Sequence, residues 1–213
     1  MTCGQQDRSS DRVVVFIDAQ NLYNDTRRAF GGHGDPATMG QVDPMKLAYL
    51  LASKRPAGVT QDRSLGEVRV YRGRPDPRKE PKTYGPHMRQ CSSWQAAGAT
   101  VIARSLRYPD GWPTLKPEEK GIDVQIAVDM VTMAINRELD VAILVSTDTD
   151  LIPALEAYSV LPTDDPPVCE VTAWRATGKQ LRVKGEHLWC HFLEHEDYLR
   201  VRDRRDYNVD PRR

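Results

Sequence analysis

Two short apolar runs interrupt an otherwise mixed sequence. They are VVVFI at residues 13–17 and VAILV at residues 141–145, and neither contains a polar residue. Runs of this kind are typical of strands that are covered on both faces of a parallel sheet. The pattern predicts strands at residues 12–18, 67–73, 100–104, 141–146 and 168–173, and helices at 21–30, 44–53, 86–97, 122–137, 150–158 and 188–201. Alternating strands and helices predict an α/β fold with a mostly parallel sheet and crossover helices.

The length and composition predict one domain. With 213 residues, 39% hydrophobic and 28% charged, the chain can fill one core. We expect a flexible N-terminus at residues 1–11, a single domain at 12–201 and a polar, frayed tail at 202–213. No apolar stretch approaches the roughly 18 residues of a membrane span, and the first residues lack the apolar core of a signal peptide. We therefore expect a cytoplasmic protein without a membrane partner. The four cysteines form no CxxC pair, so reduced thiols are expected.

The formal net charge is zero, but the charges are unevenly distributed. Residues 69–107 hold nine Lys or Arg against two acids, whereas residues 118–165 hold eleven acids against two bases. A basic segment beside an acidic pocket would suit a polyanionic substrate, although both segments could equally be solvated faces of unrelated elements. Candidate RNA contacts are Arg72, Arg74, Lys79, Lys82 and Arg107. Tyr71, Tyr84 and Trp94 could stack on bases, although core or rim positions are commoner for such residues.

Carboxylates follow directly after both apolar runs. Asp18 ends the first, and the string STDTD at residues 146–150 places Asp148 and Asp150 behind the second. Ligands bind beyond the carboxyl ends of strands in open parallel sheets, where these acids could meet. Asp123 adds a third carboxylate, because it opens a helix face that is otherwise apolar. Clustered carboxylate oxygens favour a hard cation such as Mg²⁺ or Mn²⁺.

Asp123, Asp148 and Asp150 also have a simpler explanation, as residues that start a helix. Ser146, Thr147, Asp148 and Thr149 are all good capping residues. Asp123 would be favoured by the helix dipole at the start of its helix. Asp129 lies about 120° around that helix from Asp123, at the edge of the buried face, and is a secondary candidate. The combination of acids with Asn21 favours the metal hypothesis more than any one residue does.

The string HLWCHFLEH at residues 187–195 spaces three histidines at i, i+4 and i+8, with Cys190 nearby. In a helix this spacing could form a transition-metal site. We favour a structural role, in which the apolar residues form the packing face and the histidines its polar flank. The residues of that expected face are Leu188, Trp189, Phe192 and Leu193.

Three strings give the chain a resemblance to a known family. FIDAQNLY at 16–23, KGIDVQIAVDM at 120–130 and LVSTDTDLIPAL at 144–155 resemble the motifs of NYN domains of the LabA-like group, in the PIN-like nuclease superfamily. VYRGRP at 70–75 is a weaker match, and the resemblance covers about residues 13–192. The family usually has glycine where Ala19 and Thr147 stand, and often an aromatic residue where Leu151 stands.

The resemblance implies a three-layer α/β/α sandwich with a five-stranded sheet in the order 3-2-1-4-5. It also implies an endoribonuclease that depends on Mg²⁺ or Mn²⁺, in which the metal lowers the pKa of a bound water. Asp18 and Asp148 would be metal ligands, and Asp123 and Asp150 would be ligands or hold metal-bound water. Asn21 would orient Asp18 or contact the scissile phosphate.

Other roles and partners stay open. Lys120, in the family's lysine position, could neutralise a phosphate oxygen or pair with an acid, and Ser146 is a further secondary candidate. The substrate would be single-stranded or structured RNA, while DNA is not excluded because no residue identifiably contacts a 2′-hydroxyl. The alternative function is a catalytically weak NYN module that binds RNA or a protein partner in regulation. A homodimer is compatible with the sequence.

Overall fold

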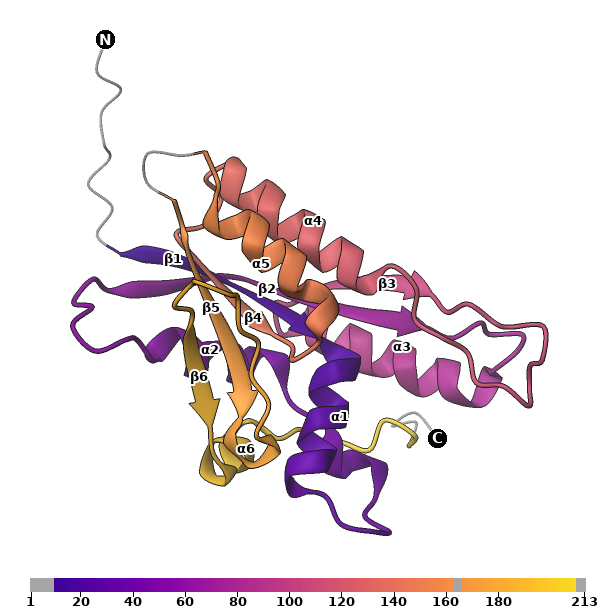
Figure 1. Ribbon diagram of the computed structural model, residues 1–213. Coiled ribbons are helices and arrows are strands. Elements are labelled where there is room, and N and C mark those ends of the chain that lie inside the picture. Colours follow the sequence, from indigo (N-terminus) through magenta and orange to yellow (C-terminus); the bar gives the residue numbers. More distant parts are fainter. Residues whose placement is uncertain (1–9, 163–165, 210–213) are drawn as a thin grey trace.

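A single twisted parallel sheet organises the protein (Figure 1). The computed structural model describes residues 10–162 and 166–209. Within these residues the sheet has six strands in the order β3-β2-β1-β4-β5-β6, and all neighbours are parallel. The strands are β1 (Asp11–Asp18), β2 (Arg63–Arg74), β3 (Thr100–Ser105), β4 (Val141–Val145), β5 (Val168–Trp174) and β6 (Trp189–Leu193). The expected α/β fold and the order 3-2-1-4-5 are confirmed, with one additional strand at the β5 edge.

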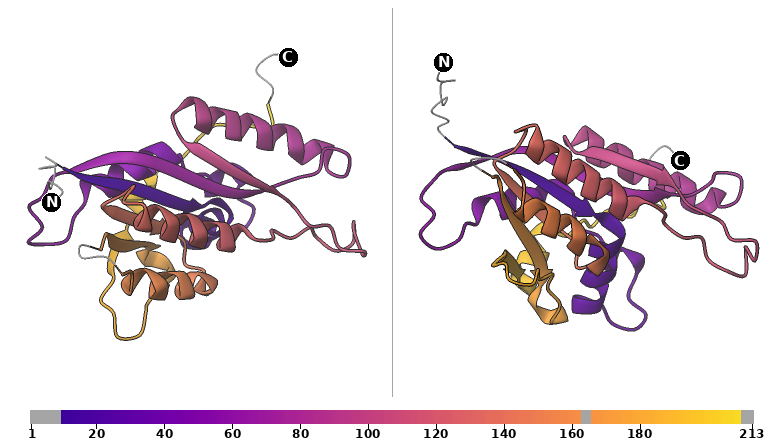
Figure 2. Two further views of the ribbon diagram at one scale, coloured as in Figure 1. Left: turned by 90° about the horizontal axis from the view of Figure 1, so that it is seen from above. Right: turned by 45° about the horizontal axis from the view of Figure 1, so that its top comes forward.

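Helices cover both faces of the sheet and complete three layers. The helices are α1 (Ala19–Phe30), α2 (Pro44–Ser53), α3 (Pro81–Ala96), α4 (Ile122–Ile135), α5 (Ile152–Ser159) and α6 (His195–Val201). Short 3-10 turns lie at η1 (Ala37–Gly40), η2 (Thr149–Leu151) and η3 (Arg175–Thr177). One apolar core lies under α1, α2, α3 and α6, and the other lies under α4 and α5. Figure 2 shows α3 and the α4–α5 pair on opposite faces.

The central strands are apolar throughout because both of their faces are covered. Val13, Val15 and Ile17 of β1 belong to the first core, whereas Val14 and Phe16 belong to the second. Burying each such side chain contributes about 1.5–3 kcal/mol. These strands set the geometry of the acids, because residues 13–17 pair in register with residues 141–145. The carboxyl ends of β1 and β4 are therefore adjacent.

The prediction of a helix at residues 188–201 is wrong for the first half of that segment. Residues 189–193 instead pair with β5 as the edge strand β6, and a capping box between Glu194 and Asp197 starts α6. Trp and Phe favour strands, and the open edge of β5 supplies hydrogen-bond partners that a helix would not use. The expected packing face fails as well, because Phe192 is 36% exposed.

The three histidines therefore do not share a helix face. His191 is buried and its Nε2 lies 2.8 Å from Oε2 of Glu170, which also forms a buried ion pair with Arg63. His187 lies before β6, and His195 begins α6. The histidine spacing that suggested a transition-metal site therefore does not bring the three side chains to one helix face.

The segment after Val201 is ordered as far as the structure describes it, up to Val209. Arg202 forms an antiparallel bridge with Val42, and the Tyr207 hydroxyl donates to Oδ2 of the buried Asp203 (2.7 Å). Arg89 of α3 donates from Nε to the Tyr207 carbonyl (2.8 Å). The expected fraying therefore does not apply to residues 202–209.

Two further findings concern the helices and the cysteines of the described ranges. None of the helices there is both long and apolar enough to cross a membrane. Cys91, Cys169 and Cys190 are free, and Cys3 lies outside the described residues. Burial raises the pKa of Cys169 to about 12 and that of Cys190 to about 11.

Candidate active site

Asp18 is a buried carboxylate at the point where β1 becomes α1. It caps the helix, because its Oδ1 accepts a hydrogen bond from the Asn21 backbone N–H (2.9 Å). The side chain is buried, with the residue 4% exposed. Burial raises its pKa to about 7; the Asn21 hydrogen bond opposes this, and the charges of Glu119, Asp123 and Asp148 add to it. Asp18 thus carries a charge that neighbouring acids disfavour.

The loop after β4 brings Asp148 to the same end of the sheet. The Ser146 hydroxyl connects the two strand ends, because it donates to Oδ2 of Asp18 (3.4 Å) and accepts from the Asp148 backbone N–H (3.1 Å). Asp148 caps η2 by accepting from the Asp150 backbone N–H (3.0 Å). Asp150 is exposed. The capping explanation for Asp148 is therefore correct, and it coexists with the acid's position beside Asp18.

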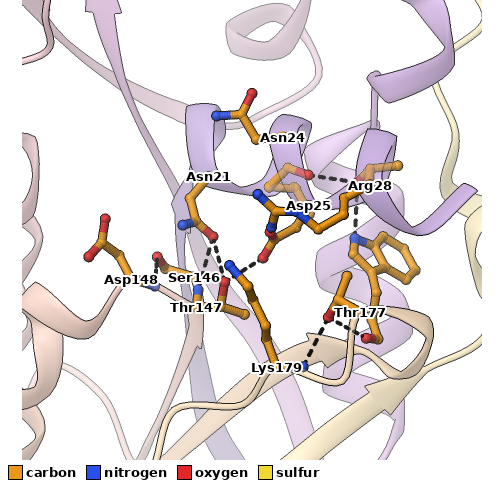
Figure 3. Close-up of polar contacts among 12 residues, drawn as sticks. Asn21, Asn24, Asp25, Arg28, Ser146, Thr147, Asp148, Thr177 and Lys179 are labelled. Atoms are coloured by element: carbon orange, nitrogen blue, oxygen red, sulfur yellow. Dashed lines mark hydrogen bonds and ion pairs between the residues drawn. The ribbon is translucent and has the colours of Figure 1, made fainter. Parts of the chain in front are cut away.

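Helix α1 holds this loop in place through two polar side chains (Figure 3). The Asn21 Oδ1 accepts from the Thr147 backbone N–H (2.9 Å), and the buried Asp25 accepts from the Thr147 hydroxyl. Arg28 pairs with Asp25 from one turn further along. Asn21 therefore orients Asp18 through its backbone, while its side chain fixes the loop that carries Asp148.

Asp123 approaches from the first turn of α4. Gly121 precedes the helix in a left-handed conformation (φ 73°), which a side chain would strain. Burial raises the pKa of Asp123, and the charges of Asp148 and Asp150 raise it further. The structure thus places Asp18, Asp123 and Asp148 within electrostatic reach of one another, with Asp150 at the outer side.

Glu119 is a fifth acid of this group, and no motif or spacing in the sequence indicated it. It lies in the loop between β3 and α4, which an antiparallel bridge between Arg107 and Glu118 fixes. Its carboxylate accepts from the Gly73 backbone N–H at the end of β2. Burial raises the pKa of Glu119, and the charge of Asp123 also raises it. Only the loop geometry brings this residue to the strand ends.

Asp25 is a further residue that sequence reasoning missed, although its spacing from Asn21 indicated a shared helix face. It lies one helical turn after Asn21, so both face the same side of α1. A buried acid on that face indicates a bonding partner, which the structure identifies as Thr147 together with Arg28.

Asp129 is held apart from the acidic group by partners of its own. Burial alone would raise its pKa, but hydrogen bonds from Arg69 (2.9 Å), Tyr71 (2.8 Å) and Gln125 (2.8 Å) lower it. Its role is therefore structural. Tyr71 is fully buried, so the suggestion that it stacks on RNA bases is wrong.

The candidate RNA contacts divide by exposure. Arg74, Lys79, Lys82, Arg107 and Lys120 are exposed. Lys79 lies 4.4 Å from the centre of the Tyr108 ring. Arg72 is half-buried, because its guanidinium lies 5.1 Å from the Trp94 ring and donates to Gln90 (2.8 Å). Trp94 is buried and Tyr84 is half-buried, so neither forms an open stacking surface.

The acidic group offers the ligand chemistry of a hard cation. Its donors are all carboxylate oxygens, and burial together with mutual repulsion raises the pKa of Asp18, Glu119 and Asp123. In the described part of the chain, no three His, Cys, Asp or Glu side chains are gathered closely enough to hold a metal ion. The residue types and charges fit a divalent cation, and loading one would require these side chains to turn toward a common point.

Comparisons with known proteins identify the family. Among solved structures, a Vibrio parahaemolyticus protein of unknown function is similar, with a TM-score of 0.52 and 19% identity over 80% of this chain and 85% of that chain. This likeness concerns the fold alone. No curated protein matches the sequence. The NYN domain family model matches residues 12–160, well over half of the 213 residues. The chain therefore belongs to the NYN domain family.

Proposed function

We propose that this NYN protein is a metal-dependent endoribonuclease of the LabA-like, PIN-like type. The observation that carries the proposal is the buried Asp18, whose pKa burial and the acids Glu119, Asp123 and Asp148 raise to about 7. Such an arrangement costs folding free energy, and a bound cation would relieve that cost. Mg²⁺ or Mn²⁺ suits the all-oxygen donor set.

Asp18 and Asp148 would hold the metal, with Asp123, Asp150 and Glu119 as further ligands or as partners of coordinated water. A bound divalent cation supplies an acidified water at neutral pH and stabilises charge on the reacting phosphate. Ser146 positions Asp18 against the Asp148 backbone, and Asn21 positions the loop after β4. These residues hold Asp18 and the loop after β4 in place before substrate binds.

RNA is the proposed substrate because exposed Lys and Arg side chains lie near the carboxyl ends of β2 and β3 and near the start of α3. Arg74 ends β2, Arg107 follows β3, Lys79 precedes α3, and Lys82 lies in the first turn of α3. These positions offer charge-neutralising contacts to a phosphate backbone that approaches the acidic group. Lys120 precedes Gly121, the N-cap of α4, and is exposed. It takes part in none of the ion pairs between described residues, so it would contact phosphate.

One observation favours a second candidate function, a catalytically weak module that binds RNA or a protein partner in regulation. The acids of the described residues are not gathered around one point as they stand. A protein that never loads a metal would have no reason to gather them. Melting curves in EDTA, Mg²⁺ and Mn²⁺ separate the two functions, because a ligand that binds only the folded state raises the melting temperature. The nuclease hypothesis expects a shift that Asp18→Asn abolishes, and the binding module expects none.

Cleavage is the direct test. A mixed panel of fluorescent single-stranded RNA, hairpin RNA and DNA is incubated with Mn²⁺, Mg²⁺ or EDTA. We expect wild type to cut RNA only with metal and Asp148→Asn to be inactive. The matched control is Asp110→Asn, an exposed aspartate in the β3–α4 loop, which should cut normally. Equal traces for wild type in all three conditions would refute the nuclease proposal for these substrates.

A further inference from the structure

A cavity of about 770 Å³ lies beside the acidic group, at the carboxyl ends of β1 and β2. Its walls come from α1, α3, the ends of β1 and β2, the β3–α4 loop and the ordered C-terminal segment. Ile17 and Ala19, the neighbours of Asp18, line it, and so does Glu119. Cavities of this size hold small organic ligands. Glu119 therefore belongs both to the acidic group and to the cavity wall.

The cavity wall contains buried polar side-chain atoms that lack partners. Trp94 Nε1 and His87 Nδ1 have no hydrogen-bond partner within the protein, and these residues are only 7% and 5% exposed. Arg72 Nε and Gln41 Oε1 are likewise buried and unpaired. All four residues line this one cavity. Buried polar atoms without partners are uncommon, so their concentration here indicates a ligand that supplies the partners.

The charge and shape of the walls indicate what kind of ligand this is. Arg72 lines the cavity together with the carboxylates Glu118 and Glu119, and it interacts electrostatically with Glu119, so the lining carries no excess of positive charge for a phosphate. Burial, with Arg72 and Arg74 adding to it, lowers the pKa of His87 to about 3, which leaves the ring neutral. Much of the remaining wall is apolar, from Ile17, Leu22, Val70, Pro86 and Leu106. A ligand that complements these walls is a neutral, flat ring with apolar faces and an edge that both donates and accepts hydrogen bonds.

We propose that the cavity takes up one nucleobase of the RNA, next to the phosphate that the acidic group acts on. The inference rests on the proposed function, because it assumes that an RNA strand lies across Asp18. A nucleobase has the required faces and edge, and proteins read unpaired bases through such contacts. The unpaired atoms of Trp94, His87, Arg72 and Gln41 would discriminate between bases. The enzyme would then require an unpaired nucleotide at one position beside the cut.

Binding of single nucleotides tests the cavity without any cleavage. Isothermal titration calorimetry with AMP, GMP, CMP and UMP is carried out in EDTA. We expect at least one nucleotide to bind wild type and to bind about tenfold more weakly to Trp94→Phe, which keeps a ring but loses the indole N–H. Trp189→Phe, at the far edge of the sheet, is the matched control and should bind as wild type does. Thr83→Trp adds bulk from an exposed wall residue and should block binding without a change in the core.

Cleavage with abasic substrates separates this inference from the proposed function. RNAs that carry a single abasic nucleotide at successive positions should be cut at least about tenfold more slowly at one position beside the cut site. If nucleotides bind in a Trp94-dependent manner but no metal supports cleavage, the cavity assignment stands and the nuclease proposal fails. If RNA is cut while no nucleotide binds and no abasic position matters, the cavity inference is overturned and the nuclease proposal stands.

Discussion

Replacing Asp18 with asparagine is expected to stabilise the metal-free protein at pH 8 while it abolishes metal-dependent cutting. Asparagine caps a helix as well as aspartate does, so α1 keeps its first hydrogen bond. What the substitution removes is a charge that burial, with help from Glu119, Asp123 and Asp148, makes unfavourable. The folded pKa is about 7 against an ordinary value of 3.8, which at about 1.4 kcal/mol per pH unit amounts to about 4 kcal/mol.

The sign of this effect fixes the pH range of the experiment. A carboxyl whose folded pKa is raised stabilises the folded state below its unfolded pKa, and this stability is lost as the pH rises through the folded pKa. Between pH 5 and pH 8 in EDTA, the free energy of unfolding of wild type should therefore fall by about 3 kcal/mol more than that of Asp18→Asn.

Urea unfolding followed by circular dichroism measures this difference directly. Asp110→Asn, which removes an exposed carboxylate, should follow wild type across the whole pH range. Adding Mn²⁺ at pH 8 should restore wild type and leave Asp18→Asn unchanged. Parallel pH profiles for wild type and Asp18→Asn would refute the reasoning.

Two further predictions concern the buried polar contacts. Glu170→Gln leaves the charge of Arg63 buried without its partner, so it should lower the free energy of unfolding by about 3–5 kcal/mol in urea. Asp62→Asn, at an exposed ion pair, should lower it by less than about 1 kcal/mol. Equal losses for the two variants would contradict this prediction. Asn21→Ala removes the acceptor of the Thr147 backbone N–H, so it should cost about 1–3 kcal/mol and slow RNA cleavage; a variant with wild-type stability and rate would show that the loop needs no such support.

The sequence predicted the centre of the sheet better than its edge. The runs at residues 13–17 and 141–145 are typical of strands covered on both faces, and the structure places them side by side. Residues 188–201 were harder, because their apolar positions suit a strand as well as a helix. The deciding factor was the open edge of β5, which pairs with β6 and is not visible in the sequence of that segment.

The acids of the candidate site also differ in how far the sequence predicted them. Asp18 and Asp148 follow apolar runs, so their positions are consequences of strand order. Glu119 reaches the site only through the bridge that folds the β3–α4 loop, and loop geometry has no periodic signal in the sequence. Thr147, where the family usually has glycine, is accommodated because its backbone is not in the left-handed region and its hydroxyl donates to Asp25.

Helix capping does not account for the carboxylate at Asp18. A cap is worth about 1 kcal/mol, and asparagine or serine would supply it without a charge. The burial that raises the pKa of Asp18 to about 7 costs about 4 kcal/mol at alkaline pH, several times the value of the cap. A chain under selection for stability alone would not keep a carboxylate there. Its presence beside Asp123 and Asp148 therefore supports the proposed divalent cation, a compensating partner from outside the protein that would serve all of these acids.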